Sequence, residues 1–225
     1  MQQDVPSAAL LAMLERFDIA LSAPNAALRA LRAQTYLLFL VRRHVELLDG
    51  RQTDKMSFWP LVRVAFQGDA YRQLRADIGT IVNFRNTVAH DLRIGLAPST
   101  LRECCLIAGM PECQDILKLA DDIDSLPKRR MYREAATAIR DAVDEGVVSL
   151  AVFEVMSRAL VAVMEQQALL GHITPASAAI VADTVKRHTR NRRANLRRGA
   201  SLMRRAFAYA TMKVPRVGRR GISKH

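Results

Sequence analysis

The sequence predicts an all-α protein, a helical bundle with a basic C-terminal helix and tail. Ala and Leu are abundant, Gly and Pro number only 10 and 8 of 225 residues, and aromatic residues make up 5%. This composition favours helices over strands. Apolar residues recur every three or four positions, and no strand-length stretch alternates apolar and polar residues. A chain of this length is long enough to bury a sizeable core.

The first half of the chain divides into helical segments separated by turn residues. Pro24-Asn25, Asp49-Gly50 and Gly68-Asp69 interrupt the apolar periodicity and are expected to end one helix or begin the next. Thr53 or Asp54 is expected to cap a short helix. The expected helices lie at residues 7–21, 26–48, 53–59 with a continuation at 61–66 beyond a kink at Pro60, and 71–90.

The second half also contains only predicted helices. Ser99 is expected to cap the first, Gly146 to separate two others, and Thr174 with Pro175 to begin the last. The expected helices lie at residues 99–108, 111–125, 127–145, 147–170 and from 175 to about 213. Charged residues interrupt the apolar stretch at 147–170, so this stretch fits a buried core helix better than a membrane span.

Positive charge is concentrated at the C-terminal end. The net charge is +12, and 14 of the 34 Lys and Arg residues lie between Lys186 and His225, where no Asp or Glu occurs. The rest of the chain is close to neutral. We therefore expect a helical core at 1–97, additional helices packed on it at 98–172, and a basic C-terminal helix with a disordered tail at 173–225. Acid-free basic segments are typical of proteins that bind polyanions.

One segment, Asn83 to Asp91, combines chemically capable side chains at the end of an amphipathic helix. Asn86 and His90 are separated by four residues, so they share a helix face and the amide could orient the imidazole. Arg85 is long enough to bend toward that face. Arg can bind a phosphate through two hydrogen bonds, and His can transfer protons near neutral pH. These groups could cleave RNA without a metal ion or other cofactor.

This Arg-Asn-x-x-x-His pattern resembles the signature of the HEPN superfamily, at Arg85, Asn86 and His90. Members are small helical bundles, and many are metal-independent ribonucleases of bacterial toxin–antitoxin, phage-defence or RNA-guided systems. The resemblance implies a homodimer with a composite cleft, cleavage through a 2′,3′-cyclic phosphate, and an antitoxin or defence-system partner. Many toxins of this family carry a Tyr two residues after the His, whereas this chain has Leu92. Regulation by nucleotide transfer to that Tyr is therefore not expected.

The same residues also have a purely structural interpretation. Arg85 could form an ion pair with Asp77 or Asp91, and His90 could be favoured at the helix C-terminus by the helix dipole. Asn86 could then be an ordinary surface residue. The sequence leaves both interpretations open.

The basic segment carries an apolar stripe that runs from Leu196 to Ala210 at helical spacing. Three interpretations are open: contact with an RNA or DNA backbone, binding to an anionic membrane surface, and docking to an acidic protein or to the body of the chain. The nucleic-acid interpretation is preferred. The candidate binding residues are Arg190, Arg192, Arg193, Arg197, Arg198, Arg204 and Arg205.

Other chemically capable residues predict little function. Three cysteines, Cys104, Cys105 and Cys113, suggest reduced thiols rather than a disulfide framework. The acidic residues at 121–124 and His44 are each expected on a solvated face. No metal-binding spacing is evident, and the first residues lack a signal-peptide pattern. We therefore expect a cytoplasmic protein that needs no cofactor.

Overall fold

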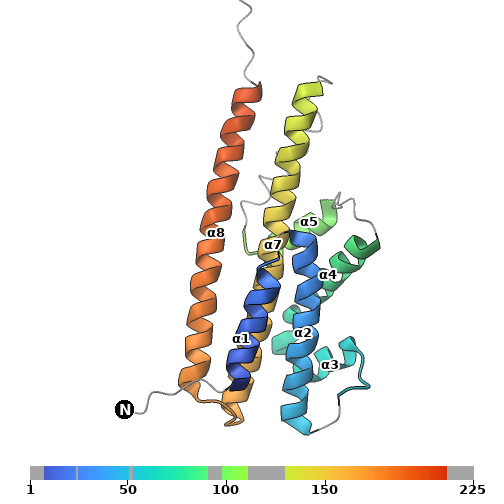
Figure 1. Ribbon diagram of the computed structural model, residues 1–225, viewed down its shortest axis with the longest axis vertical. Helices are drawn as coiled ribbons and strands as arrows, with labels where there is room; N and C mark the ends of the chain where they lie inside the picture. The colour runs from blue at the N-terminus through green and yellow to red at the C-terminus, as the bar shows by residue number, and fades with distance from the viewer. Residues whose placement is uncertain (1–7, 24, 51–52, 91–97, 111–129, 212–225) are drawn as a thin grey trace, which may run out of the picture.

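The computed structural model describes residues 8–23, 25–50, 53–90, 98–110 and 130–211, and this part of the chain is all-α, as the sequence predicts. Its helices form a bundle around the long helix α7 (Figure 1). The helices are α1 (Ala8–Leu21), α2 (Ala26–Asp49), α3 (Phe58–Ala65), the 3₁₀ turn η1 (Asp69–Tyr71), α4 (Arg72–His90), α5 (Pro98–Ile107), α7 (Arg130–Leu169) and α8 (Pro175–Thr211).

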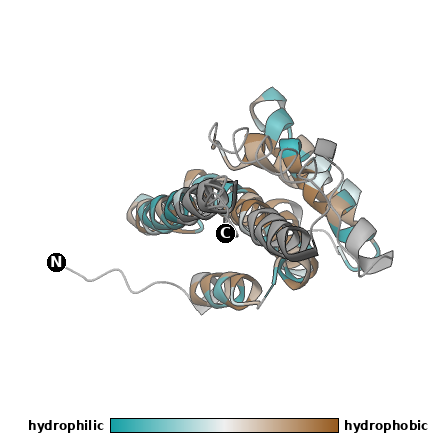
Figure 2. Cartoon of the chain, turned by 90° about the horizontal axis from the view of Figure 1, so that it is seen from above, coloured by the Kyte–Doolittle hydropathy of each residue, from teal (hydrophilic) through white to brown (hydrophobic). Residues whose placement is uncertain are grey.

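The middle of α7 is the centre of the core. Residues from all seven described α-helices belong to one buried apolar cluster, and from Val147 to Ala159 almost every α7 side chain is buried. Helices α2 and α4 pack on one part of α7, while α5 and α8 cover others. Seen from above, individual helices carry separate hydrophobic and hydrophilic faces (Figure 2). Burial of the hydrophobic faces drives the packing.

The segment Glu145–Leu169 is long and apolar enough to cross a membrane, but 89% of its most apolar window is buried inside the bundle. It therefore serves as the core helix that the interrupting charges suggested. Helices α7 and α8 run antiparallel and extend together beyond the ends of the other helices (Figure 1). The basic segment up to Thr211 is thus helical, and α8 packs on the core helix as far as Leu196 rather than forming a separate arm.

Several predicted helix ends agree with the structure. The side chain of Asn25 accepts a hydrogen bond from the Leu28 amide at 2.9 Å and caps α2. Gly50 ends α2 in a left-handed conformation, with φ of 62°, which is least costly for glycine. Thr174 caps α8, because its Oγ1 accepts a hydrogen bond from the Ser177 amide at 3.2 Å.

Three predicted boundaries are wrong. The short helix begins at Phe58, so Pro60 lies in its first turn, where a missing N–H is tolerated. Thr53 does not cap this helix but donates a hydrogen bond to Glu46 Oε1 at 2.7 Å. Helix α5 begins at Pro98 rather than after Ser99. Finally, Gly146 does not separate two helices.

Helix α7 continues through Gly146, and α8 packs against that position. A Cβ atom built on Gly146 would lie 2.7 Å from Cδ1 of Leu196. The missing side chain therefore makes room for α8 instead of ending α7. The predicted helix at 111–125 and the tail beyond residue 211 lie outside the described residues.

Candidate functional site

The C-terminal end of α4 carries the predicted catalytic motif. Ile81, Val82 and Phe84 are buried, which anchors this end of the helix in the core. Arg85 is half-buried, and its Nη1 donates a hydrogen bond to Oδ1 of the exposed Asn86 at 3.0 Å. The guanidinium therefore bends toward the helix face of Asn86. His90 is the last residue of α4, and its side chain lies outside the described part.

Asp77 does not pair with Arg85, so one structural alternative for the motif is wrong. Its Oδ2 lies 2.8 Å from Nη2 of Arg158 on α7, and its Oδ1 accepts a hydrogen bond from Gln73 at 2.8 Å. Asp77 thus ties α4 to α7 two turns before the motif. The other suggested partner, Asp91, lies outside the described residues.

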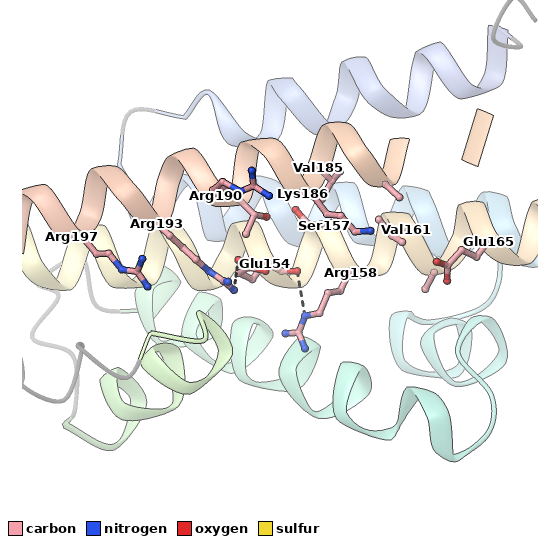
Figure 3. Close-up of a pocket in the computed structure, with 13 residues that line it drawn as sticks. Glu154, Ser157, Arg158, Val161, Glu165, Val185, Lys186, Arg190, Arg193 and Arg197 are labelled. Carbon is pink, nitrogen blue, oxygen red and sulfur yellow. Dashed lines mark hydrogen bonds and ion pairs between the residues drawn. The ribbon is translucent and has the colours of Figure 1, made fainter. Parts of the chain in front are cut away.

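A groove of about 570 Å³ lies between α7 and α8 (Figure 3). Val161 and Ala162 of α7 and Ala182 and Val185 of α8 supply its apolar part. Five of its lining residues are cationic and two are acidic. The cationic residues are Arg158, Lys186, Arg190, Arg193 and Arg197, and the acidic residues are Glu154 and Glu165.

Part of this charge is neutralised within the protein. Glu154 is only 7% exposed, and its Oε1 lies 2.9 Å from Nη2 of Arg193, which ties α8 to α7. Burial raises the pKa of Glu154, while Arg193 and Arg158 oppose that shift. Nε of Arg158 also donates to the Glu154 backbone oxygen at 3.4 Å, and its guanidinium reaches Asp77. Lys186 and Arg190 have no carboxylate partner among the described residues.

The predicted arginines of α8 point in different directions. Arg190, Arg193 and Arg197 line the groove. Arg192 instead places its guanidinium 4.6 Å from the centre of the Phe153 ring, and burial, followed by the nearby Arg29, lowers its pKa. Arg198 is exposed but does not line the groove. The side chains of Arg204 and Arg205 lie outside the described part.

Two cations of the groove, Lys186 and Arg158, are absent from the residues predicted from the sequence. Lys186 belongs to the same stripe as Arg190, Arg193 and Arg197, because steps of four, three and four residues stay on one face of a helix. That spacing could have identified it. Arg158 could not have been found in this way, because only the packing of α7 beside α8 brings it to the groove.

His44 is buried, so the prediction of a solvated position is wrong. Its Nε2 lies 2.6 Å from Gln166 Oε1, and Nδ1 lies 2.6 Å from Gln167 Nε2. This arrangement fits a neutral ring that donates through Nε2 and accepts at Nδ1. Burial lowers the pKa of His44, which favours the same neutral form. Both neighbours belong to α7, so His44 joins α2 to the core helix.

The remaining candidates add no second site. Cys104 and Cys105 are buried, while Cys113 and the acidic residues at 121–124 lie outside the described residues. Within the described ranges, no three His, Cys, Asp or Glu side chains come together in a way that could hold a metal ion. No protein-family model, curated protein or solved structure matches this chain.

Proposed function

We propose that this protein is a metal-independent endoribonuclease of HEPN type, with Arg85, Asn86 and His90 as its catalytic residues. The observation that supports this most directly is the hydrogen bond from Arg85 to Asn86. Asn86 and His90 are separated by one helical turn, so the bond brings the guanidinium toward the face on which His90 is placed. A phosphate-binding group and a proton-transfer group then share the end of one helix.

The proposed reaction needs only these side chains and the RNA. His90 removes the proton of a ribose 2′-hydroxyl, and the resulting oxygen attacks the adjacent phosphorus. The bond from phosphorus to the 5′-oxygen breaks, which leaves a 2′,3′-cyclic phosphate and, after protonation, a 5′-hydroxyl. Arg85 stabilises the negative charge that builds on the phosphate oxygens. In this mechanism the amide N–H groups of Asn86 orient His90.

The biological setting follows from the family resemblance. We propose a cytoplasmic protein of a bacterial toxin–antitoxin or phage-defence system, with an antitoxin or another defence protein as partner. A homodimer would bring the ends of two α4 helices together around one RNA strand. Exposure of Asn86 is compatible with such an arrangement.

Cleavage of RNA in the presence of EDTA tests this function. We expect the wild-type protein to leave 2′,3′-cyclic phosphate ends, and His90→Ala to lower the rate by about 10²- to 10⁴-fold because proton transfer is lost. His188→Ala, which removes an exposed histidine from α8, is the matched control and is expected to cleave normally. Circular dichroism checks that each variant remains helical. Equal rates for His90→Ala and wild type would contradict the assignment.

The cation-lined groove favours a second candidate, a non-enzymatic helical protein that binds nucleic acid through α8. In that case RNA binding would be independent of Arg85 and His90. Deletion of the basic segment is a poor test, because Arg193 and Leu196 also hold α8 on α7. Substitution of exposed cations is a better one. Binding that is normal in His90→Ala, together with no cleavage by the wild-type protein, would favour this candidate.

A further inference from the structure

The groove between α7 and α8 contains a regular series of cations on one helix. Lys186, Arg190, Arg193 and Arg197 lie at steps of four, three and four residues. At 100° per residue they fall within a strip about 60° wide, and at 1.5 Å per residue they span about 16 Å. Figure 3 shows these four side chains distributed along α8 beside α7. A single small anion would need only part of that length.

The positive charge of the groove is only partly balanced by carboxylates of the protein, which include the exposed Glu165 of its lining. Arg193 is paired with Glu154, and Arg158 with Asp77. Lys186 and Arg190 are exposed, and within the described residues neither is close enough to a carboxylate to form an ion pair. The groove therefore favours a ligand that carries several negative charges along its length.

We propose that this groove is the track for the phosphate backbone of a single RNA strand, with Lys186 and Arg190 as its main phosphate contacts. The proposal takes RNA from the proposed function and adds the surface that binds it. Positively charged grooves that follow the backbone are typical of single-strand binding.

The lining of the groove also predicts how the strand is bound. No aromatic residue lines it within the described part of the chain, so stacking on bases contributes little there. Binding through phosphates alone depends strongly on salt and weakly on base identity. We therefore expect similar affinities for oligouridine and oligoadenine of equal length.

Two double variants of equal charge test the proposal. Lys186→Gln with Arg190→Gln removes two cations from the groove. Arg187→Gln with Arg198→Gln removes two exposed cations of α8 that do not line it. Binding of a labelled 20-nucleotide oligouridine is measured from 50 to 300 mM salt by fluorescence anisotropy. His90→Ala is the parent of both variants, so that cleavage does not disturb the isotherms.

We expect the groove variant to bind about tenfold more weakly at 0.15 M salt, and its slope of log K against log salt to fall by about 1.4 in magnitude, since each lost single-strand contact removes about 0.7. The control variant should stay near its parent. Equal losses in both variants, or no binding by the parent, would overturn the proposal. So would an RNA duplex that binds through the same two residues as tightly as the single strand.

A membrane surface is the competing polyanion, and flotation with phosphatidylserine vesicles examines it with the same variants. If the groove variant loses vesicle binding but not RNA binding, the RNA proposal is wrong. The binding experiment also distinguishes failure of the groove proposal from failure of the proposed ribonuclease activity. Loss of cleavage in His90→Ala, together with groove-dependent RNA binding in that background, supports both proposals, whereas groove-dependent binding without wild-type cleavage supports the track and refutes the nuclease.

Discussion

Substitution of Gly146 by alanine measures how closely α8 packs on α7. Glycine in the interior of a helix costs about 1 kcal/mol relative to alanine, so a glycine that merely lies in a helix is stabilised by Gly→Ala. Gly146 differs because its Cβ would lie 2.7 Å from Cδ1 of Leu196. Carbon atoms prefer separations of about 3.5 to 4.0 Å, so Leu196 must move by roughly 1 Å.

The higher helix propensity of alanine and its clash with Leu196 have opposite effects on stability, and the two can be measured separately. Overpacking in a well-packed interior costs about 1 to 3 kcal/mol. We therefore expect Gly146→Ala to leave the free energy of unfolding unchanged or to lower it by up to about 2 kcal/mol. When Leu196 is first replaced by alanine, the clash disappears. In that background Gly146→Ala should stabilise the protein by about 1 kcal/mol.

Urea denaturation followed by circular dichroism gives the four free energies of this double-mutant cycle. Gly79→Ala is the matched control, because its Cβ on α4 would lie 3.6 Å from the Trp59 ring of α3, which is an ordinary van der Waals contact. It is expected to stabilise the protein by about 1 kcal/mol. If Gly146→Ala stabilises the wild-type protein as much as Gly79→Ala does, the close approach of α8 to α7 is wrong.

Two further predictions concern buried ionisable groups and use the same denaturation assay. Burial lowers the pKa of His44 below 6.5, so the unfolded chain gains a proton at a higher pH than the folded protein does. The free energy of unfolding should therefore fall as the pH drops below about 6.5, by up to about 1.4 kcal/mol per pH unit. A pH profile for His44→Gln as steep as that of wild type would contradict this. Arg193→Gln leaves the buried Glu154 carboxylate without its partner and should cost about 3 kcal/mol at neutral pH, with the loss growing as the pH rises through the raised pKa of Glu154. Glu154→Gln should lower the free energy of unfolding by only about 1 kcal/mol, because the partly exposed Arg193 can turn to water. If Arg193→Gln and Glu154→Gln lower it equally, this reasoning is wrong.

Much of the helical architecture could be predicted from the sequence. The apolar periodicity of 26–48 and 71–90 corresponds closely to α2 and α4, and the caps at Asn25 and Thr174 depend only on neighbouring residues. Gly146 was misassigned because glycine ends a helix in one context and allows close helix packing in another. Only the position of Leu196 distinguishes the two.

Some features of the candidate site could likewise be predicted from the sequence, and others could not. The order Arg85, Asn86, His90 and the four-residue spacing on one helix are properties of the sequence, and the bend of Arg85 toward Asn86 is local enough to be expected from them. The burial of His44 was not foreseen, because its partners Gln166 and Gln167 are more than 120 residues away.

The sequence is enough to predict that this protein is helical, that its C-terminal part is basic, and which residues form the motif at the end of α4. These properties depend on composition and on spacing within single helices. The packing of the helices was needed to see that the basic segment lies along the core helix, that Arg192 faces Phe153, and that Arg193 pairs with Glu154. Burial and pairing depend on which helices meet, and a cation in one helix gives no indication of the surface that another helix will place beside it.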